Sequence, residues 1–410
     1  MDTLIATYRI VTPTFLGGAE PTADAELRLP SFKGALRFWW RALMWGHISD
    51  IDRLRKTEAL LFGSSDSAVG QSKVTLSITG LPRPVPVPLR PGDILGCKGG
   101  KTQPRVDVVG EGARYLGYGL MEPFDGRETI GGRLTRSCLA SPLEFQARVQ
   151  FRPGTGDALR TQTINSLKLL GLCGGLGSRS RRGFGSLTLT GLAGMGQSSW
   201  AAPGSARVWE ESLKAVVGPL PQGNALPEWT SFSAGHTRVL VVRGVQEAPL
   251  ETLARLGRDF VFFRSWGKNG KVLGLPREGN FKDDHDLMRQ RGPQDRKTHP
   301  RRIVFGLPHN YGKRADEQVG PADPGLDRRA SPLFFHIHQP ADQTPPLGIL
   351  LFLPSRYLPP NRDRVSVGGP SVPLSHQGTG EFWNPVHAFL ERVQAGRGKE
   401  RFAETRLIEL

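Results

Sequence analysis

The segment 174–187 (GGLGSRSRRGFGSL) places the strongest constraint on the fold of this chain. It contains five glycines, three arginines and three serines. Apolar residues recur at roughly helical spacing over 158–172 before the segment, whereas residues 186–191 after it alternate as in a strand. A dinucleotide-binding fold needs the opposite order, with a strand before the glycine loop and a helix after it. The pattern therefore predicts a helix, a glycine-rich loop (174–185) and a strand, and it disfavours a Rossmann domain.

The composition of this glycine-rich loop favours the binding of a polyanion. Glycine lets a backbone approach a ligand closely, and arginine offers a planar, permanently charged fork that fits phosphate oxygens. A glycine cap on the preceding helix would explain one or two of the glycines, but not the arginines between them. The residues predicted to contact the polyanion here are Gly174, Gly175, Gly177, Ser178, Arg179, Arg181, Arg182, Gly183 and Phe184.

A second motif is the predicted helix 31–45, which carries an apolar face and a basic stripe. The apolar face is formed by Phe32, Leu36, Trp39, Trp40 and Leu43. Beside it, Lys33, Arg37 and Arg41 recur every four residues, and none has an acidic partner at i+4. Because like charges at this spacing repel, the stripe suggests an external anion. The alternative is an amphipathic helix whose basic face is simply solvated, and we expect the tryptophans in the core.

The overall charge agrees with a polyanionic partner. The chain of 410 residues has 54 basic and 38 acidic residues, a net charge of +16 and a pI near 10.2. A GC-rich genome would also enrich arginine. No apolar run approaches the eighteen residues of a membrane span, and the first residues lack a secretory signal. Three widely spaced cysteines predict neither a disulfide framework nor a metal site. We expect a cytoplasmic protein.

The residues of these motifs also resemble a known family. The similar stretches are 15–19 (FLGGA), 29–43 (LPSFKGALRFWWRAL), the glycine-rich loop, 305–309 (FGLPH) and 328–333 (RRASPL). In them the chain resembles the RAMP superfamily of CRISPR systems, and within it the family of first-numbered subunits of the Cmr (type III-B) RNA-guided effector complex. The resemblance implies a non-catalytic RNA-binding subunit in antiviral defence, without cofactor or metal. Its implied partners are guide RNA near the 3′ region, target RNA, and other Cmr subunits, including a neighbouring RAMP subunit at the filament end.

The order of the predicted elements indicates an α+β fold with two similar halves. The first half has strands at 3–12, 73–79, 143–151 and 186–190 and helices at 31–45 and 157–172, with an extra short helix at 51–62. The second half has strands at 236–245, 333–338, 348–353 and 405–409 and helices at 250–264 and 382–394. Both read βαββαβ, which is the ferredoxin-like, RRM-type order. This agrees with the two tandem ferredoxin-like domains that the resemblance implies.

Two long segments interrupt this order. We predict an N-terminal domain over 1–193 with an insertion at about 81–140, and a C-terminal domain over 235–410 with a basic insertion at about 265–329. Residues 194–234 would connect them. The second insertion is rich in arginine, so we expect Arg301, Arg302 and His309 to contact RNA, with Arg28 assisting from the loop before the first helix. A solvated loop explains the same arginines equally well.

Other motifs carry less weight. Segment 96–102 (GCKGGKT) resembles a phosphate loop, but it has three residues between its glycines instead of four and lacks the flanking strand and helix. His336 and His338 alternate on one strand, and we expect an RNA-facing or half-buried pair. The main alternative function is a RAMP-family endoribonuclease that processes or cleaves RNA. It would need a His–Tyr or His–Lys pair beside the glycine-rich loop, where the sequence offers only His47 and a distant Tyr8. We therefore predict no catalytic residue.

Overall fold

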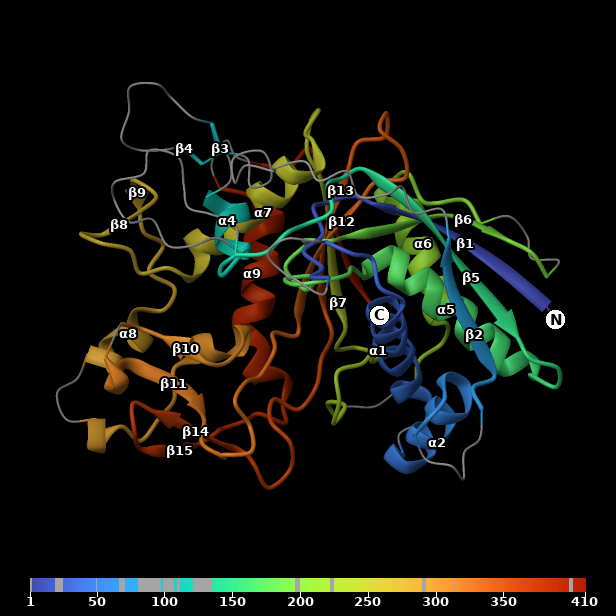
Figure 1. The fold of residues 1–410 in the computed structure, drawn as a ribbon. Helices are drawn as coiled ribbons and strands as arrows, with labels where there is room; N and C mark the ends of the chain where they lie inside the picture. Colours follow the sequence, from blue (N-terminus) through green and yellow to red (C-terminus); the bar gives the residue numbers. More distant parts are fainter. Residues whose placement is uncertain are drawn as a thin grey trace.

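Two four-stranded antiparallel sheets and the helices packed on them form most of the protein (Figure 1). The computed structural model describes residues 2–18, 25–48, 50–65, 71–79, 97–98, 107–108, 111–120, 135–195, 200–221, 225–289, 293–312, 314–397 and 401–410. Most of the expected insertion at 81–140 lies outside these residues, and so does the segment 96–102 except for residues 97–98. No helix in the described part of the chain is long and apolar enough to cross a membrane.

The first sheet is built from the N-terminal half. Its strands are β1 (Asp2–Ile10), β2 (Val74–Thr79), β5 (Leu143–Phe151) and β6 (Leu187–Ala193), in the order β2-β5-β1-β6. The long helices α1 (Leu29–Ile48) and α5 (Asp157–Cys173) follow β1 and β5 and pack against each other. Alternate residues of β5 are buried, as expected for a strand with one face toward helices. These strands and helices confirm the element order that was predicted for this half.

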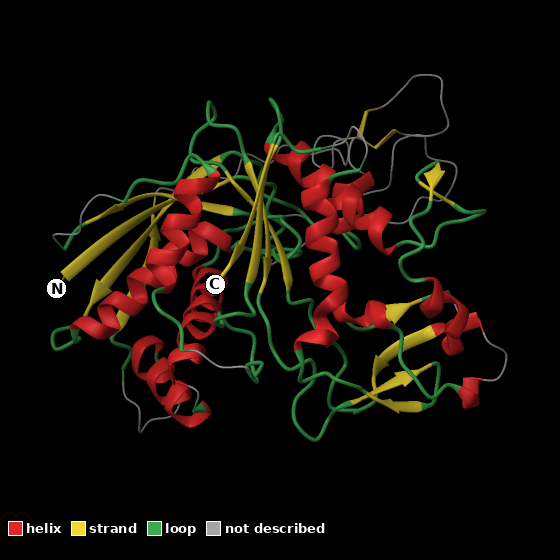
Figure 2. Cartoon of the chain, turned by 180° about the vertical axis from the view of Figure 1, so that it is seen from behind, coloured by secondary structure: helices red, strands yellow, loops and turns green. Residues whose placement is uncertain are grey.

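The second sheet repeats the same connectivity. It consists of β7 (Arg238–Arg243), β12 (Leu333–His338), β13 (Leu347–Phe352) and β16 (Glu404–Glu409), in the order β12-β13-β7-β16, with α7 (Pro249–Arg264) after β7 and α9 (Asn384–Ala395) after β13. Every residue of β12 and β13 is buried. Figure 2 shows why, because helices of both halves flank this central sheet. The predicted strands and helices of the second half are confirmed as well.

The segments between these elements also contain helices and strands. The connector 194–234 contains α6 (Ala206–Val217), whose buried Trp209 donates a hydrogen bond to the Leu172 carbonyl of α5. The insertion 265–329 contributes two strands to a small third sheet. Its strands are β10 (His309–Asn310), β11 (Gln318–Pro321), β14 (Arg364–Val367) and β15 (Ser371–Pro373).

The remaining described elements are α2 (Ile51–Phe62), β3 (Cys97–Lys98), β4 (Asp107–Val108), α4 (Glu111–Leu116), β8 (Lys271–Val272), β9 (Leu275–Pro276), α8 (Lys282–Arg289), η1 (Pro293–Asp295), η2 (Arg301–Phe305), η3 (Ala315–Glu317) and η4 (Gly380–Trp383).

Strand β12 carries a histidine pair that lies inside the junction of the two halves. His336 and His338 are each 1% exposed, so the expectation of an RNA-facing or half-buried pair is wrong. Burial lowers the pKa of both, that of His338 to about 4, so both rings are neutral at pH 7. The His338 ring nitrogens lie 3.3 Å from the Gly171 carbonyl oxygen and 3.0 Å from that of Pro203. His338 therefore ties the second sheet to the first half.

Candidate nucleic-acid interface

The glycine-rich loop packs tightly against its own chain. The amides of Leu176, Ser178 and Gly185 each donate a 2.9 Å hydrogen bond, to the carbonyls of Gly185, Phe15 and Pro13. Gly177 has a φ of 82°, and a Cβ there would lie 2.6 Å from the Phe15 carbonyl oxygen. Side chains at Gly174, Gly175 and Gly183 would likewise collide with neighbouring protein atoms. The glycines are thus required for internal packing, which corrects the reason given for them from sequence.

Phe184 and Arg179 lie on opposite sides of this loop. Phe184 is 0% exposed and packs edge to face on Phe15, with ring centroids 5.7 Å apart. Its side chain therefore has no surface for a base, and the expectation that Phe184 contacts RNA is wrong. Arg179 is exposed and has a φ of 63°, in the left-handed region that few non-glycine residues adopt. This conformation turns the chain at the one arginine of the loop that faces solvent.

Arg181 and Arg182 reach from the loop into the second half of the protein. The guanidinium of Arg181 lies 4.8 Å from the ring of Phe334 and donates to the Ser331 carbonyl at 3.3 Å. The guanidinium of Arg182 lies 5.2 Å from the ring of Phe260 and donates to the Phe305 carbonyl at 3.1 Å. The backbone joins the halves too, because the Phe335 amide donates to the Arg181 carbonyl. Both arginines therefore hold the two halves together, and both line the cavity between the halves.

We call this cavity the basic pocket. Its volume is about 910 Å³. It is lined by Tyr115, Leu116, Tyr118, Arg179, Ser180, Arg181, Arg182, Phe260, Arg264, Phe305, Gly306, Leu307, Pro308, His309, Asn310, Arg328, Arg329, Ala330 and Ser331. Six arginines and one histidine thus line it, and no Asp or Glu is among the described lining residues. Among these cations, Arg328 pairs with Asp327, which lies next to the lining residues, at 3.3 Å.

Several buried donors of the pocket lack partners within the protein. Arg182 Nη1, Arg264 Nε and His309 Nε2 are buried without a hydrogen bond. Burial, reinforced by neighbouring arginines, lowers the pKa of Arg181 to about 10 and that of Arg182 to about 9. Both side chains remain charged at pH 7. Because buried unpaired donors and charges are costly, an anion with several acceptor oxygens would stabilise this arrangement.

His309 is the residue whose surroundings sequence reasoning missed. It contacts Arg264 and Tyr311 and lines the same pocket as the glycine-rich loop, although more than a hundred residues separate them in the chain. Arg264 Nη2 lies 3.3 Å from His309 Nδ1 and can only donate, so Nδ1 accepts and Nε2 carries the proton. Burial and the charges of Arg264 and Arg302 lower the pKa of His309 well below its usual value. The imidazole is therefore a neutral donor at the pocket wall, and its Nε2–H is buried without a partner in the protein.

The third wall of the pocket comes from the insertion at 81–140. Helix α4 crosses α7 where Gly112 meets Gly257, and a side chain at either position would overlap the other helix. This close crossing brings Tyr115 to Arg264, which donates to the Tyr115 hydroxyl at 3.1 Å. Tyr118 follows α4 and is 77% exposed at the edge of the pocket. Sequence reasoning missed this wall, because nothing in the sequence indicates that Gly112 and Gly257 lie against each other.

Three other predicted residues do not line the basic pocket. Arg302 lies behind its wall, where its side chain donates to the Arg264 carbonyl at 2.7 Å and stacks on Tyr311. Arg301 lines a different pocket, on the other face of η2. Arg28 is exposed just before α1. Of Arg301, Arg302 and His309, which were all expected to contact RNA, only His309 lines the basic pocket.

Two of the three cations of the basic stripe, Arg37 and Arg41, are paired, contrary to the sequence expectation. Arg37 Nε and Arg41 Nη1 donate to the same oxygen of Glu58, at 2.6 and 2.8 Å. Glu58 belongs to α2, which folds back beside α1, and it is buried. Lys33 and Arg37 line a shallow basic depression together with Arg55, Lys56 and Arg152 of neighbouring segments. Lys33 and Arg37 of the stripe thus line this depression, whereas residues of the glycine-rich loop line the basic pocket.

Pairing with Glu58 predicts a structural role for Arg37 and Arg41. Replacing both by Ala leaves the Glu58 carboxylate buried without a partner, and we expect unfolding free energy to fall by about 1–3 kcal/mol. Adding Glu58→Gln should restore part of the loss, because the amide needs no cation. Urea denaturation of the parent, double and triple variants measures this. A double variant as stable as the parent, or a triple variant less stable than the double, would show that the pairing is not structural.

Comparison with known proteins places the first half of this chain in a family. Residues 7–188 match the model of the RAMP superfamily, a stretch that contains the end of β1 and all of α1, β2, β5, α5 and the glycine-rich loop. This region belongs to the RAMP superfamily. The RAMP region therefore supplies most of the first sheet and two walls of the basic pocket, the glycine-rich loop and α4. The remaining walls come from α7 and the segments around His309 and Arg329, beyond the matched stretch.

Two curated relatives are similar to different shares of this chain. CRISPR system Cmr subunit Cmr1-1 of Pyrococcus furiosus is 26% identical over 321 residues, 76% of each protein. Cmr subunit Cmr1-2 of the same organism is 27% identical over 199 residues, 45% of this chain and 94% of its own length. Among solved structures, apo Cmr1 from P. furiosus is 19% identical with a TM-score of 0.48, covering 95% of this chain and 97% of its own. A chain of the type III-B Cmr-beta complex bound to cognate target RNA and AMPPnP is 10% identical with a TM-score of 0.48, covering 95% of this chain and 99% of its own.

Proposed function

We propose that this protein is a non-catalytic RNA-binding subunit of a type III-B (Cmr) CRISPR effector complex. The RAMP region and the similarity to two Cmr1 proteins support a place in that complex. Its RNA partners would be the guide RNA, near the 3′ region, and the complementary target. Its protein partners would be other Cmr subunits, foremost the neighbouring RAMP subunit at the end of the filament.

The same proposal includes two ferredoxin-like domains. Their support is the strand order, since both sheets place the second, third, first and fourth strand of a βαββαβ unit side by side, all antiparallel. We assign residues 1–193 to the first domain, 194–234 to the connector and 235–410 to the second. Because α6 of the connector packs on α5, the connector is part of the first domain's core rather than a free linker.

The basic pocket is the observation that carries the RNA-binding proposal. Six arginines and a neutral histidine donor surround a volume of about 910 Å³, with no acidic group on the described walls. Phosphodiester oxygens are acceptors only and carry negative charge, so they satisfy both the unpartnered donors and the uncompensated charge. Tyr118, exposed beside the pocket, offers a ring on which a base can stack.

The geometry around His309 supports binding without cleavage. The structure does place a histidine and tyrosines beside the glycine-rich loop, which is the arrangement an endoribonuclease would need. However, the Nε2 of His309 already carries the proton, and its lowered pKa keeps the ring uncharged. It therefore serves poorly both as a base at that nitrogen and as an acid. Specific RNA cleavage that disappears in a His309→Ala variant would favour the endoribonuclease instead.

Binding of single-stranded RNA by the purified chain tests the proposal. Each neutralised phosphate contributes about −0.7 to the slope of log K against log salt. If three to six cations of the pocket contact phosphates, the slope should be about −2 to −4, with little sequence preference. Filter binding at several salt concentrations measures it, with intact RNA recovered afterwards. A slope near zero, or no binding at low salt, would contradict the proposal.

A further inference from the structure

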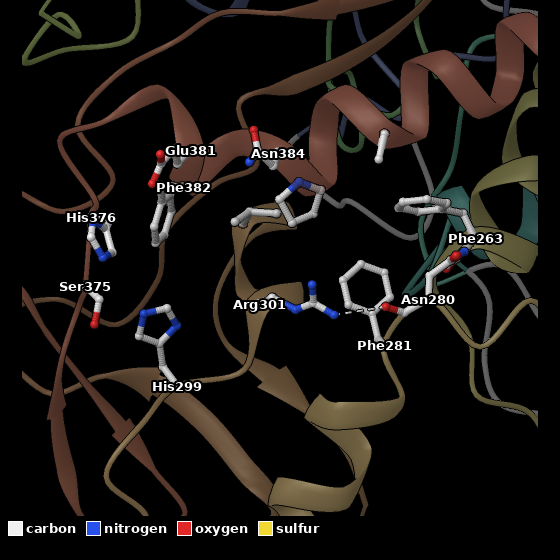
Figure 3. Close-up of a pocket in the computed structure, with 13 residues that line it drawn as sticks. Phe263, Asn280, Phe281, His299, Arg301, Ser375, His376, Glu381, Phe382 and Asn384 are labelled. Carbon is white, nitrogen blue, oxygen red and sulfur yellow. Dashed lines mark hydrogen bonds between the residues drawn. The ribbon is translucent and has the colours of Figure 1, made fainter.

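A second cavity opens on the other face of η2, between this segment and the start of α9. We call it the aromatic pocket and define it by Phe263, Phe281, His299, Arg301, Glu381 and Phe382. Its volume is about 490 Å³, within the range of small-ligand sites. In Figure 3, His299, His376 and Phe382 face one another on one side of Arg301, and Phe281 and Asn280 lie on the other. None of the motifs discussed above accounts for this site.

The walls of the aromatic pocket suit a flat ring. Phe263 and Phe281 are buried and pack edge to face, with centroids 5.6 Å apart and planes at 87°. Across the cavity, the rings of His299 and Phe382 have centroids 6.0 Å apart. Val304 also lines the cavity from η2. A planar group placed here would contact ring faces and edges on several sides, which favours aromatic ligands over flexible chains.

The rim of the aromatic pocket adds hydrogen-bond donors and acceptors, and its one positive and one negative charge cancel. Arg301 and Glu381 are exposed and bring one positive and one negative charge. His299 Nδ1 lies 3.3 Å from the Pro300 carbonyl, which only accepts, so Nδ1 holds the proton and Nε2 is an acceptor. Burial lowers the pKa of His299, and the ring is neutral at pH 7. A phosphate would meet the Glu381 carboxylate, so an uncharged ligand with donors and acceptors fits best.

The two pockets lie on opposite faces of the same elements. In η2, Arg301 and Val304 line the aromatic pocket whereas Phe305 lines the basic pocket. In α7, Phe263 and Arg264 divide in the same way. One cavity is thus rich in positive charge and the other is neutral and aromatic. This division matches the two chemical parts of a nucleotide, the phosphate and the base.

We propose that the aromatic pocket binds an uncharged nucleobase, supplied either by an unpaired nucleotide of bound RNA or by a free nucleoside. An aromatic side chain of a partner protein would fill the phenylalanine walls, but it would leave Arg301, Glu381 and His299 Nε2 without ligand partners. The edge of a base provides acceptors for Arg301 and donors for the other two. Binding of a base that belongs to RNA rests on the proposed function, whereas binding of a free nucleoside does not.

Replacement of two alanines of α9 by tryptophan, one inside the pocket and one outside it, tests the proposal. Ala388 and Ala395 are both exposed on this helix, and only Ala388 lines the aromatic pocket. Ala388→Trp should fill the cavity, and Ala395→Trp should add the same bulk elsewhere. Calorimetric titration of the full chain with adenosine, guanosine, cytidine and uridine, up to millimolar concentration, should show saturable binding of at least one nucleoside. We expect Ala395→Trp to bind like the parent and Ala388→Trp to bind at least tenfold more weakly.

Several outcomes would overturn the proposal. These are the absence of saturable nucleoside binding by the parent, equal binding by the two variants, or a pocket that takes N-acetylphenylalaninamide but no nucleoside. Circular dichroism of both variants must show that they are folded. If Ala388→Trp unfolds, the smaller Ala388→Leu is used in its place, with Ala395→Leu as its control.

Photocrosslinking separates the two sources of the base. Single-stranded RNA with 4-thiouridine should crosslink to peptides that contain Phe281 or Phe382, and Ala388→Trp should reduce this crosslink at least fivefold. RNA that binds but crosslinks only to the glycine-rich loop would exclude RNA as the source and leave the free nucleoside. RNA that does not bind would contradict the proposed function, while the nucleoside titration still decides the aromatic pocket.

Discussion

We expect Gly185→Ala to lower the free energy of unfolding by about 3 kcal/mol. Gly185 has a φ of 65°, where a residue with a Cβ costs about 1–2 kcal/mol. A Cβ there would also overlap the Leu176 carbonyl oxygen, on the facing side of the glycine-rich loop. Forcing backbone atoms apart in a closed loop adds about 1–3 kcal/mol. Urea denaturation followed by tryptophan fluorescence measures the loss, since several tryptophans lie in the core.

Gly154→Ala separates these two contributions. Gly154 has a similar φ of 75°, but a Cβ there would meet no atom within 4 Å. This control should therefore lose only about 1 kcal/mol, from backbone strain alone. If Gly185→Ala were no more destabilising than Gly154→Ala, the internal packing assigned to the loop would be wrong. The glycine would then be free to serve a ligand, as the sequence alone had indicated.

Replacing Arg179 and Arg328 together by Gln should have the largest effect on RNA binding. Both line the basic pocket and both are exposed, so their loss removes charge without the cavity that Arg181 or Arg182 would leave. Each lost phosphate contact should reduce the slope of log K against log salt by about 0.7, or about 1.4 in total. We expect roughly tenfold or greater weakening of RNA binding near 0.1 M salt, measured by filter binding.

The control for this double variant removes the same charge elsewhere. Arg207 and Arg314 are exposed and pair with Glu211 and Asp316, and neither lines the basic pocket. With both changed to Gln, the salt slope should stay close to that of the parent, and melting temperatures should agree among all three proteins. Equal weakening of RNA binding in the two double variants would mean that only the net charge matters. The basic pocket would then lose its role.

Local patterns were sufficient to predict the elements of both sheets. In the run Leu333–His338, the only polar residues are the two histidines. This run forms the edge strand β12, in which every residue is buried. The apolar face of α1 was predicted residue by residue, and all five of its members are buried, namely Phe32, Leu36, Trp39, Trp40 and Leu43. Periodicity carries such information because each element must bury its own apolar side wherever it packs.

Contacts between distant segments could not be predicted in this way. Glu58 pairs with both Arg37 and Arg41 from another helix. The search for acidic partners at i+4 within α1 alone could not detect this pairing. Likewise, His309 lines the same pocket as the glycine-rich loop, although more than a hundred residues separate them in the chain. The loop glycines were assigned to a ligand because sequence gives no view of the carbonyl that stands beside Gly177. The charge of the basic pocket was visible in sequence, but its walls were not.

A structure of the chain with bound single-stranded RNA tests the central claim most directly. We predict a phosphate in the basic pocket within hydrogen-bond distance of Arg182 Nη1 and His309 Nε2, with Arg179 and Arg328 on the adjoining backbone. RNA bound instead across the depression at Lys33 and Arg37, with the basic pocket empty, would contradict the account.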